Sequence, residues 1–322
     1  MSQRAPDNRP SAGAASRYLE RLSKALPGPR MWRGSREFWP DNGKLVICIS
    51  LQFEGGSQPG RALAGPLTGF ESRFPDQPIA KWYEYGFKEG IPRLLEIFQR
   101  RRVHVTCHMA GSAVERNPQL AKEIVESGHE AAAHGQSWVP QYPVTADEER
   151  ASYDTNVESI VRATGVRPVG FDGFWRRSTP QTLEILQDLG FIYHIDDVSR
   201  DEPSLVSVRG RPFAVVPYTL ELNDLVVYEL RNYSTEQYAA DLKNEFEMLY
   251  AEAESRRRMM SISAHDRIAG RPARAKVLEE FIIYAQRRPG VVFMRKDEIA
   301  RFVLASSITP REDEIAREAD AA

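Results

Sequence analysis

The chain has 322 residues, of which 42% are apolar, and its 43 Lys and Arg nearly balance its 45 Asp and Glu to give a net charge of −2. This near-balance argues against a nucleic-acid or membrane-surface partner that is held by bulk charge. Two cysteines rule out a disulfide framework and a zinc knuckle. The chain has no run of 18 apolar residues, and residues 1–30 lack the apolar segment of a secretory signal, so we expect a cytoplasmic protein.

The two ends of the chain differ in composition from its middle. Residues 1–31 are rich in Arg, Ala, Ser, Pro and Gly and are expected to form a flexible arm. Residues 304–322 form a charged tail. Between them, residues 32–303 are expected to fold as one α/β domain.

Apolar runs typical of strands alternate with amphipathic segments along this middle part. The runs are Leu45–Phe53, Val103–Met109, Glu130–His134, Val169–Phe171, Phe191–Ile195, Phe213–Val216, Met260–Ala264 and Val291–Met294. Helix signals separate them, such as the capping-box spacing of Thr145 and Glu148. Such alternation predicts a parallel sheet, either open or closed into a barrel.

The residues that follow the first strand favour the barrel. They read Gln52-Phe53-Glu54-Gly55-Gly56-Ser57, which matches neither a dinucleotide-binding fingerprint nor a phosphate-binding loop. In a barrel, the active site is built at the carboxyl ends of the strands. Polar residues at the ends of the predicted strands are therefore the candidates for function.

Three strand ends carry such residues. Gln52 and Glu54 point the same way because side chains alternate along a strand, although Glu54 is equally well explained as a solvated loop residue or a helix cap. His134 follows a run of alanines, and His265 follows Ser261 and Ser263 on one face. A single histidine is more often structural, but two histidines at two strand ends, each beside small residues, make a polar site a nearly even alternative.

An aromatic and basic segment at Phe174-Trp175-Arg176-Arg177 could form a wall for a planar or anionic substrate. The alternative is a surface loop held by a cation–π contact, and the residues favour neither.

Together these residues resemble the polysaccharide deacetylase superfamily, also named the NodB-homology superfamily, and within it the allantoinase-like and cyclic-imidase-like branch. The stretches that carry the resemblance are Gly90–Leu95, Gly128–Gly135, Pro217–Asp224, His265–Arg274 and Asp297–Ala300. The resemblance covers about Lys44 to Phe302. It implies a distorted (β/α) barrel with seven or eight parallel strands, hydrolysis of non-peptide carbon–nitrogen bonds, and a homotetramer.

The chain departs from the metal-dependent members of that superfamily at both metal motifs. Those members carry Asp-x-Asp at the first strand end, where this chain has Gln52 and Glu54, and His-x-x-x-His at the second, where it has His134 and Trp138. A neutral amide at Gln52 cannot act as a general base. The branch that we favour shows a similar loss, which points to a small cyclic amide as substrate.

We therefore expect a hydrolase that opens a small cyclic amide, imide or ureide. A deacetylase of N-acetyl sugars with a variant metal site and a non-catalytic ligand-binding barrel are the alternatives. Either no cofactor is needed or a divalent metal such as zinc is held weakly by Glu54, His134 and His265. The expected catalytic residues are Gln52, Glu54, His134 and His265, and the expected substrate-binding residues are Trp138, Phe174, Trp175, Asn223 and Asp224.

Overall fold

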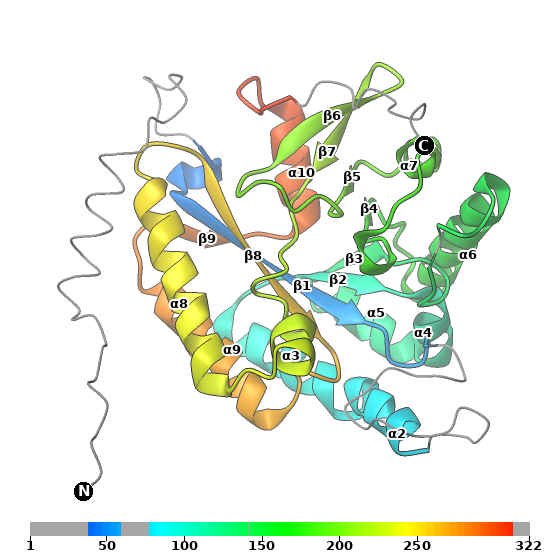
Figure 1. Ribbon diagram of the computed structural model, residues 1–322, viewed down its shortest axis with the longest axis horizontal. Helices are drawn as coiled ribbons and strands as arrows, with labels where there is room; N and C mark the ends of the chain where they lie inside the picture. The colour runs from blue at the N-terminus through cyan, green and yellow to red at the C-terminus, as the bar shows by residue number, and fades with distance from the viewer. Residues whose placement is uncertain (1–37, 59–76, 141, 312–322) are drawn as a thin grey trace, which may run out of the picture.

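The computed structural model describes residues 38–58, 77–140 and 142–311, so the predicted arm and most of the predicted tail lie outside the described residues. A nine-stranded sheet forms the centre of the molecule (Figure 1). Its strands are β1 (Leu45–Phe53), β2 (Thr106–Met109), β3 (Glu130–Ala133), β4 (Gly170–Phe171), β5 (Tyr193–His194), β6 (Ser204–Val208), β7 (Arg211–Val215), β8 (Arg258–His265) and β9 (Val291–Phe293).

The sheet follows the order β6-β7-β5-β4-β3-β2-β1-β8, and β9 pairs with the first residues of β1. Among the described residues, eight of its strands run parallel and only β6 is antiparallel. This confirms the predicted distorted barrel. Among the described residues, the sheet curls but does not close by direct strand pairing. The segment before the helical turn η4 (Leu225–Leu230) lies against β8 instead, where the N–H of Ser263 donates to the carbonyl of Leu222 at 3.1 Å.

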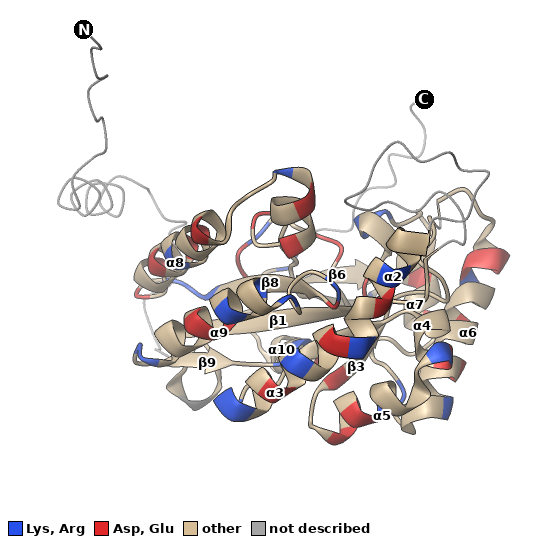
Figure 2. Cartoon of the chain, turned by 90° about the horizontal axis from the view of Figure 1, so that it is seen from below, with Lys and Arg blue, Asp and Glu red and all other residues tan. Residues whose placement is uncertain are grey.

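Helices cover the outside of the curled sheet. They are α2 (Gln77–Tyr85), α3 (Ile91–Arg101), α4 (Gly111–Arg116), α5 (Pro118–Glu126), α6 (Ala146–Thr164), α7 (Thr182–Asp188), α8 (Thr235–Glu252), α9 (Pro272–Gln286) and α10 (Lys296–Ala305), with short helical turns η1 (Pro40–Asn42), η2 (Gly86–Gly90), η3 (Phe174–Arg176) and η4 (Leu225–Leu230). Figure 2 shows that charged residues gather on these helices, whereas β1 has none. Among the described residues, no helix has both the length and the apolar character that crossing a membrane requires.

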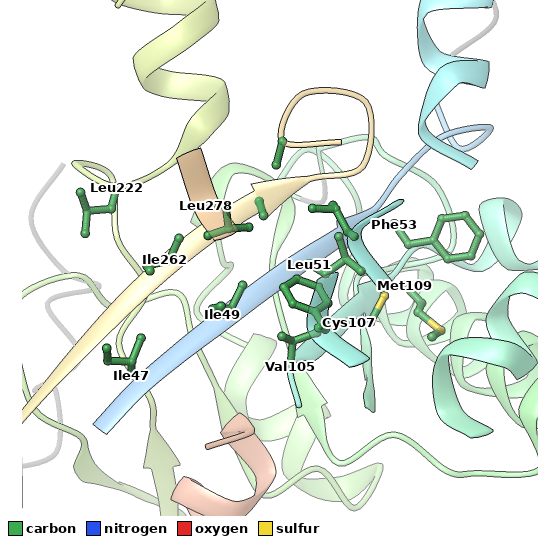
Figure 3. Close-up of a cluster of buried hydrophobic side chains, with 14 of the residues drawn as sticks. Ile47, Ile49, Leu51, Phe53, Val105, Cys107, Met109, Leu222, Ile262 and Leu278 are labelled. Carbon is green, nitrogen blue, oxygen red and sulfur yellow. The ribbon is translucent and has the colours of Figure 1, made fainter. Parts of the chain in front are cut away.

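Strand β1 shows how the sequence sorts side chains between the two faces of the sheet. Ile47, Ile49, Leu51 and Phe53 belong to the core under the helices, together with Leu278 of α9 and Val105 beside β2 (Figure 3). Burial of each such side chain stabilises the fold by about 1.5–3 kcal/mol. The even positions point into the barrel, and they become polar toward the end of the strand at Ser50 and Gln52.

Two features differ from the sequence prediction. Strand β6 was not predicted; it forms a hairpin with β7 through Arg209 and Gly210, which both have positive φ as a tight two-residue turn requires. The predicted domain boundary at residue 303 falls inside α10, which ends at Ala305. Beyond α10 the chain packs on β6, where the carbonyl of Pro310 accepts from the N–H of Leu205.

Candidate active site

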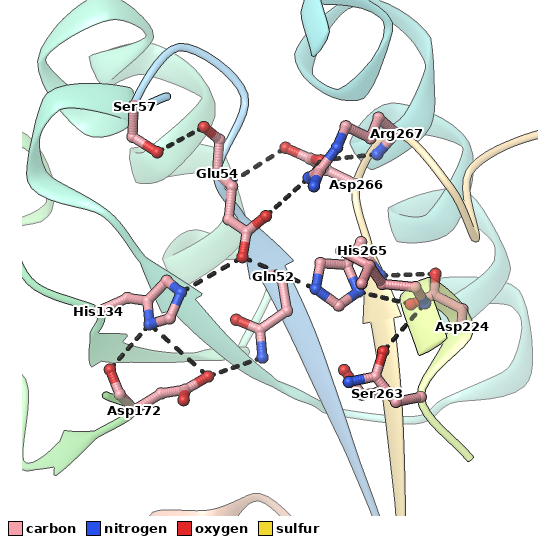
Figure 4. A network of polar contacts seen from close by, with 12 residues as sticks. Gln52, Glu54, Ser57, His134, Asp172, Asp224, Ser263, His265, Asp266 and Arg267 are labelled. Carbon is pink, nitrogen blue, oxygen red and sulfur yellow. Dashed lines mark hydrogen bonds and ion pairs between the residues drawn. The ribbon is translucent and has the colours of Figure 1, made fainter. Parts of the chain in front are cut away.

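The four predicted catalytic residues meet at the carboxyl ends of β1, β3 and β8. Parallel pairing sets Gln52 of β1 beside His265 of β8. Glu54 follows β1 and His134 follows β3 directly. Glu54 Oε1 lies 3.3 Å from His134 Nε2 and 3.7 Å from His265 Nε2 (Figure 4). All four side chains are buried.

The loop after β1 is held in place by Asp266. Its Oδ2 accepts from the backbone N–H of Glu54 at 3.2 Å and of Gly55 at 2.8 Å. A Cβ at Gly55 would lie 2.9 Å from the carbonyl oxygen of Tyr83, so the close approach of the chain requires glycine there. The direction of the Glu54 side chain is thus fixed by its own backbone.

Arg267 neutralises the carboxylate of Glu54. Its Nη1 lies 2.7 Å from Glu54 Oε2, and the guanidinium lies over the ring of Tyr83. Burial alone would raise the pKa of Glu54, but the charges of His265 and Arg267 and the hydrogen bond from His134 outweigh it and lower that pKa well below its ordinary value. Glu54 is therefore ionised and is a weak proton acceptor.

His134 carries both of its ring protons. Its Nδ1 lies 2.8 Å from the carbonyl oxygen of Asp172, and its Nε2 faces Glu54, so both partners can only accept. Burial on its own would lower the pKa of His134, but the charge of Asp172 and the hydrogen bond to Glu54 raise that pKa to about 9. At neutral pH His134 is a cation, and its role is electrostatic.

His265 is the residue arranged to move a proton. Its Nδ1 donates to Asp224 Oδ1 at 2.6 Å, which leaves Nε2 free to take or give a proton toward Glu54. Asp224 Oδ2 accepts from the N–H groups of His265 and Ala269 at 2.8 and 2.9 Å. Both oxygens of Asp224 are engaged in this way, so Asp224 positions His265 and is not placed to bind substrate as the sequence suggested.

Asn223, the other polar residue predicted to bind substrate in this segment, is also committed to the fold. Its Oδ1 accepts from the N–H groups of Leu225 and Val226, and its Nδ2 lies 3.3 Å from the hydroxyl of Tyr218. Asn223 therefore begins the η4 turn and sets the position of Asp224.

The amide of Gln52 is oriented by Asp172. Gln52 Nε2 donates to Asp172 Oδ2 at 2.9 Å and lies 3.3 Å from the hydroxyl of Tyr218, whereas its Oε1 is buried without a partner. Because a carboxylate can only accept, this contact identifies which end of the Gln52 amide is the nitrogen. Burial tends to raise the pKa of Asp172, but the charges of Arg176 and His134 lower it overall, so Asp172 is ionised.

The three aromatic residues predicted to bind substrate form one cluster at the edge of this site. The ring centroids of Trp138 and Phe174 lie 5.2 Å apart, and those of Trp138 and Trp175 lie 6.2 Å apart. Trp175 is 38% exposed, so the cluster reaches solvent. Its inner member, Trp138, has the guanidinium of Arg267 5.9 Å from its ring.

The expected catalytic and substrate-binding residues do not include Asp172, Arg176, Tyr218 or Arg267, although Arg176 stands in the aromatic and basic segment considered as a substrate wall. Asp172 follows the two-residue strand β4, and Arg267 lies two positions after His265. The alternation that identified Glu54 two positions after Gln52 would have found Arg267 as well. The sequence does not show that Arg176 turns inward, because the backbone of Trp175 and Arg176 is left-handed without a glycine at either position.

A divalent metal, which the resemblance implies for other members, does not fit these residues. The three expected ligands do face one another, but Arg267 lies 2.7 Å from Glu54 Oε2 and would repel a second cation. Within the described ranges, no group of three or more His, Cys, Asp or Glu side chains is arranged to hold a metal ion. No step of the chemistry proposed below is therefore assigned to a metal.

Comparison with known proteins places this arrangement in a family. The family model described as polysaccharide deacetylase matches residues 71–194. A crystal structure of a probable polysaccharide deacetylase from Pseudomonas aeruginosa PAO1 is 30% identical, covers 84% of this chain and 97% of its own, and superposes with a TM-score of 0.77. The chain belongs to the polysaccharide deacetylase family.

Two further relatives carry names of different enzymes, an allantoinase and a peptidoglycan deacetylase. The structure of PuuE allantoinase is 27% identical, covers 88% of this chain and 99% of its own, and gives a TM-score of 0.79. The peptidoglycan deacetylase of Helicobacter pylori is 27% identical over 74% of this chain and 92% of its own length. This polysaccharide deacetylase family member is a hydrolase of carbon–nitrogen bonds other than peptide bonds, as the sequence predicted.

Proposed function

We propose that this hydrolase opens a small cyclic amide, imide or ureide. The observation that carries the proposal is the His265–Asp224 pair, whose free Nε2 faces an ionised Glu54. Opening such a ring needs a water nucleophile, stabilisation of the developing oxyanion and a proton for the leaving nitrogen. The aromatic cluster of Trp138, Phe174 and Trp175 supports a flat ring as the substrate.

In this proposal each charged group has one task. His265 Nε2 takes a proton from the attacking water and returns it to the leaving nitrogen, while Asp224 stabilises the imidazolium that forms in between. Glu54 accepts a hydrogen bond from the water and orients it, since its low pKa makes it a poor base. Protonated His134 and Arg267 supply positive charge near the carbonyl oxygen as it becomes an anion.

A panel of substrates tests the proposal. Purified protein is incubated with hydantoin, succinimide, allantoin and acetylated chito-oligomers, and ring opening and acetate release are measured. We expect ring opening that the His265→Ala variant, prepared in parallel, lacks. Acetate release without ring opening would replace the proposal with the second candidate, an N-acetyl sugar deacetylase, which the likeness to the H. pylori protein favours. The homotetramer that the resemblance implies stays a prediction, which sedimentation would test.

A further inference from the structure

Three polar atoms around Asp172 are buried and unpaired. They are Gln52 Oε1, Asp172 Oδ1 and Arg176 Nε. Gln52 and Asp172 are fully buried, and the side chain of Arg176 is 13% exposed. A buried polar atom without a hydrogen bond costs about 1–3 kcal/mol, so three in one place call for an explanation.

The three residues are held together by shared contacts. Gln52 Nε2 donates to Asp172 Oδ2 at 2.9 Å, and Arg176 Nη2 lies 3.8 Å from Asp172 Oδ1. Tyr218 contacts both ends of the group: its hydroxyl lies 3.3 Å from Gln52 Nε2, and its ring lies 3.6 Å from the guanidinium carbon of Arg176. Figure 4 shows the Gln52 amide nitrogen pointing to Asp172, beside His134.

The backbone that delivers Arg176 is strained. Trp175 and Arg176 have φ of 52° and 54°, a left-handed conformation that costs a residue with a Cβ on the order of 1–3 kcal/mol. Asp196 holds the segment by accepting from the N–H of Gly173 at 2.8 Å and from the hydroxyl of Ser178 at 2.9 Å. Such strain sends the Arg176 side chain inward and leaves Trp175 at the surface.

The unpaired atoms define the chemistry of their ligand. Arg176 Nε–H needs an acceptor, and the oxygens of Gln52 and Asp172 each need a donor. A lactam offers one C=O and one N–H, and an imide offers two C=O and one N–H. Of these three ring classes, only the ureide offers one acceptor flanked by two donors, through its –NH–CO–NH– unit.

We propose that Gln52, Asp172 and Arg176 form a specificity site that binds the –NH–CO–NH– edge of a ring ureide, an inference that rests on the proposed function. The ureide carbonyl accepts from Arg176 Nε. The N–H of the bond that breaks donates to Gln52 Oε1, and the second N–H, which an imide lacks, donates to Asp172 Oδ1. Water then attacks the remaining ring carbonyl, the bond from that carbon to the ring nitrogen breaks, and His265 returns the proton to the nitrogen.

Hydantoin and succinimide test this site as a matched pair, because succinimide is hydantoin with one N–H replaced by CH2. In Asp172→Asn, the side-chain carbonyl keeps the hydrogen bond from Gln52, and an NH2 donor replaces the acceptor Oδ1. We expect the ratio of kcat/KM for hydantoin over succinimide to fall by on the order of 10- to 100-fold relative to wild type. This comparison cancels both the intrinsic reactivity of the rings and the fraction of folded enzyme.

Arg176→Lys is the matched control. It keeps the positive charge but loses Nε–H, whose partner carbonyl both rings possess, so KM should rise for both substrates and their ratio should hold. An unchanged ratio in Asp172→Asn, with both rings turned over, overturns the specificity site and leaves the proposed function standing. If wild type opens neither of these rings nor allantoin, the proposed function falls. Calorimetry then decides the site: tighter binding of hydantoin than of succinimide supports it, and equal or absent binding overturns it.

Discussion

The interior of the barrel holds two polar networks that differ in how completely their atoms are paired. The upper network, at the carboxyl ends of the strands, contains the unpaired atoms Gln52 Oε1, Asp172 Oδ1, Arg176 Nε and Arg267 Nε. The lower network lies nearer the amino ends of the strands and comprises Cys48, Thr106, Glu130, Tyr193, Ser261 and Lys296.

Every side chain of the lower network has a partner among the described residues. Glu130 accepts from the hydroxyls of Thr106 at 2.6 Å and Tyr193 at 2.8 Å, and Lys296 Nζ lies 3.2 Å from Cys48 Sγ. Both networks are buried, and each contains a glutamate and a tyrosine. Burial of charge alone therefore does not distinguish the two networks; their unpaired atoms do, and we infer that the lower network serves stability.

Removing the central charge of the upper network should have the largest effect. In Glu54→Gln, Arg267 loses the carboxylate at 2.7 Å and keeps only Asp266 at 3.3 Å as a partner. We expect kcat to fall by about 10²–10⁴-fold and the free energy of unfolding to fall by about 3–5 kcal/mol. Steady-state kinetics and urea unfolding measure the two effects.

Glu54→Asp is the control for that variant, since it retains the charge and should recover stability better than activity. Wild-type turnover in Glu54→Gln on an authentic substrate would show that Glu54 is structural.

A change in the lower network should alter the pH dependence of the free energy of unfolding rather than the rate of turnover. Burial, together with the charge of Asp297, raises the pKa of Glu130 to about 8. Because this pKa lies above the unfolded value, the stabilisation is complete below about pH 4 and is lost as the pH rises through 8. In Glu130→Gln, we expect the free energy of unfolding to decline less between pH 5 and 9 than in wild type, by on the order of 2–4 kcal/mol. Parallel pH profiles of the two proteins, measured by urea unfolding, would contradict this role for Glu130.

A substitution at the exposed edge of the upper network should weaken substrate binding without changing kcat. Trp175 is 38% exposed, and its ring contacts those of Trp138 and Phe174 at the edge of the site. We expect Trp175→Ala to raise KM by about 10-fold and to leave kcat unchanged, because an aromatic wall binds substrate and transition state equally. Trp175→Phe should restore most of the affinity. A fall in kcat at constant KM would place Trp175 in the chemical step.

The sequence predicted those features that follow from the alternation of side chains along a strand and from the parallel arrangement of the strands. β1 was predicted with its observed ends, and Gln52, Glu54, His134 and His265 were found because parallel strands bring their carboxyl ends together. Strand β6 was not predicted because its hairpin depends on a turn of two residues with positive φ, and one of these residues is Arg209 rather than glycine.

The roles of Asp172, Arg176 and Asp224 could not be predicted from the alternation of side chains along strands. Asp172 follows a strand of two residues, too short to show alternation, and Arg176 reaches the site through a strained backbone. Asp224 was taken for a substrate ligand because the sequence does not show that η4 turns it onto His265. Such roles depend on how loops far apart in the chain pack together.

One measurement compares the two networks directly: the rate of hydantoin ring opening by wild type, His265→Ala and Glu130→Gln, purified in the same way. His265 supplies the free Nε2 of the upper network, and Glu130 is the centre of the lower one. Our account predicts that Glu130→Gln turns over within about threefold of wild type and that His265→Ala is slower by about 10²–10⁴-fold, the usual contribution of a general acid–base group. Full activity in His265→Ala, or its loss in a folded Glu130→Gln, would contradict it.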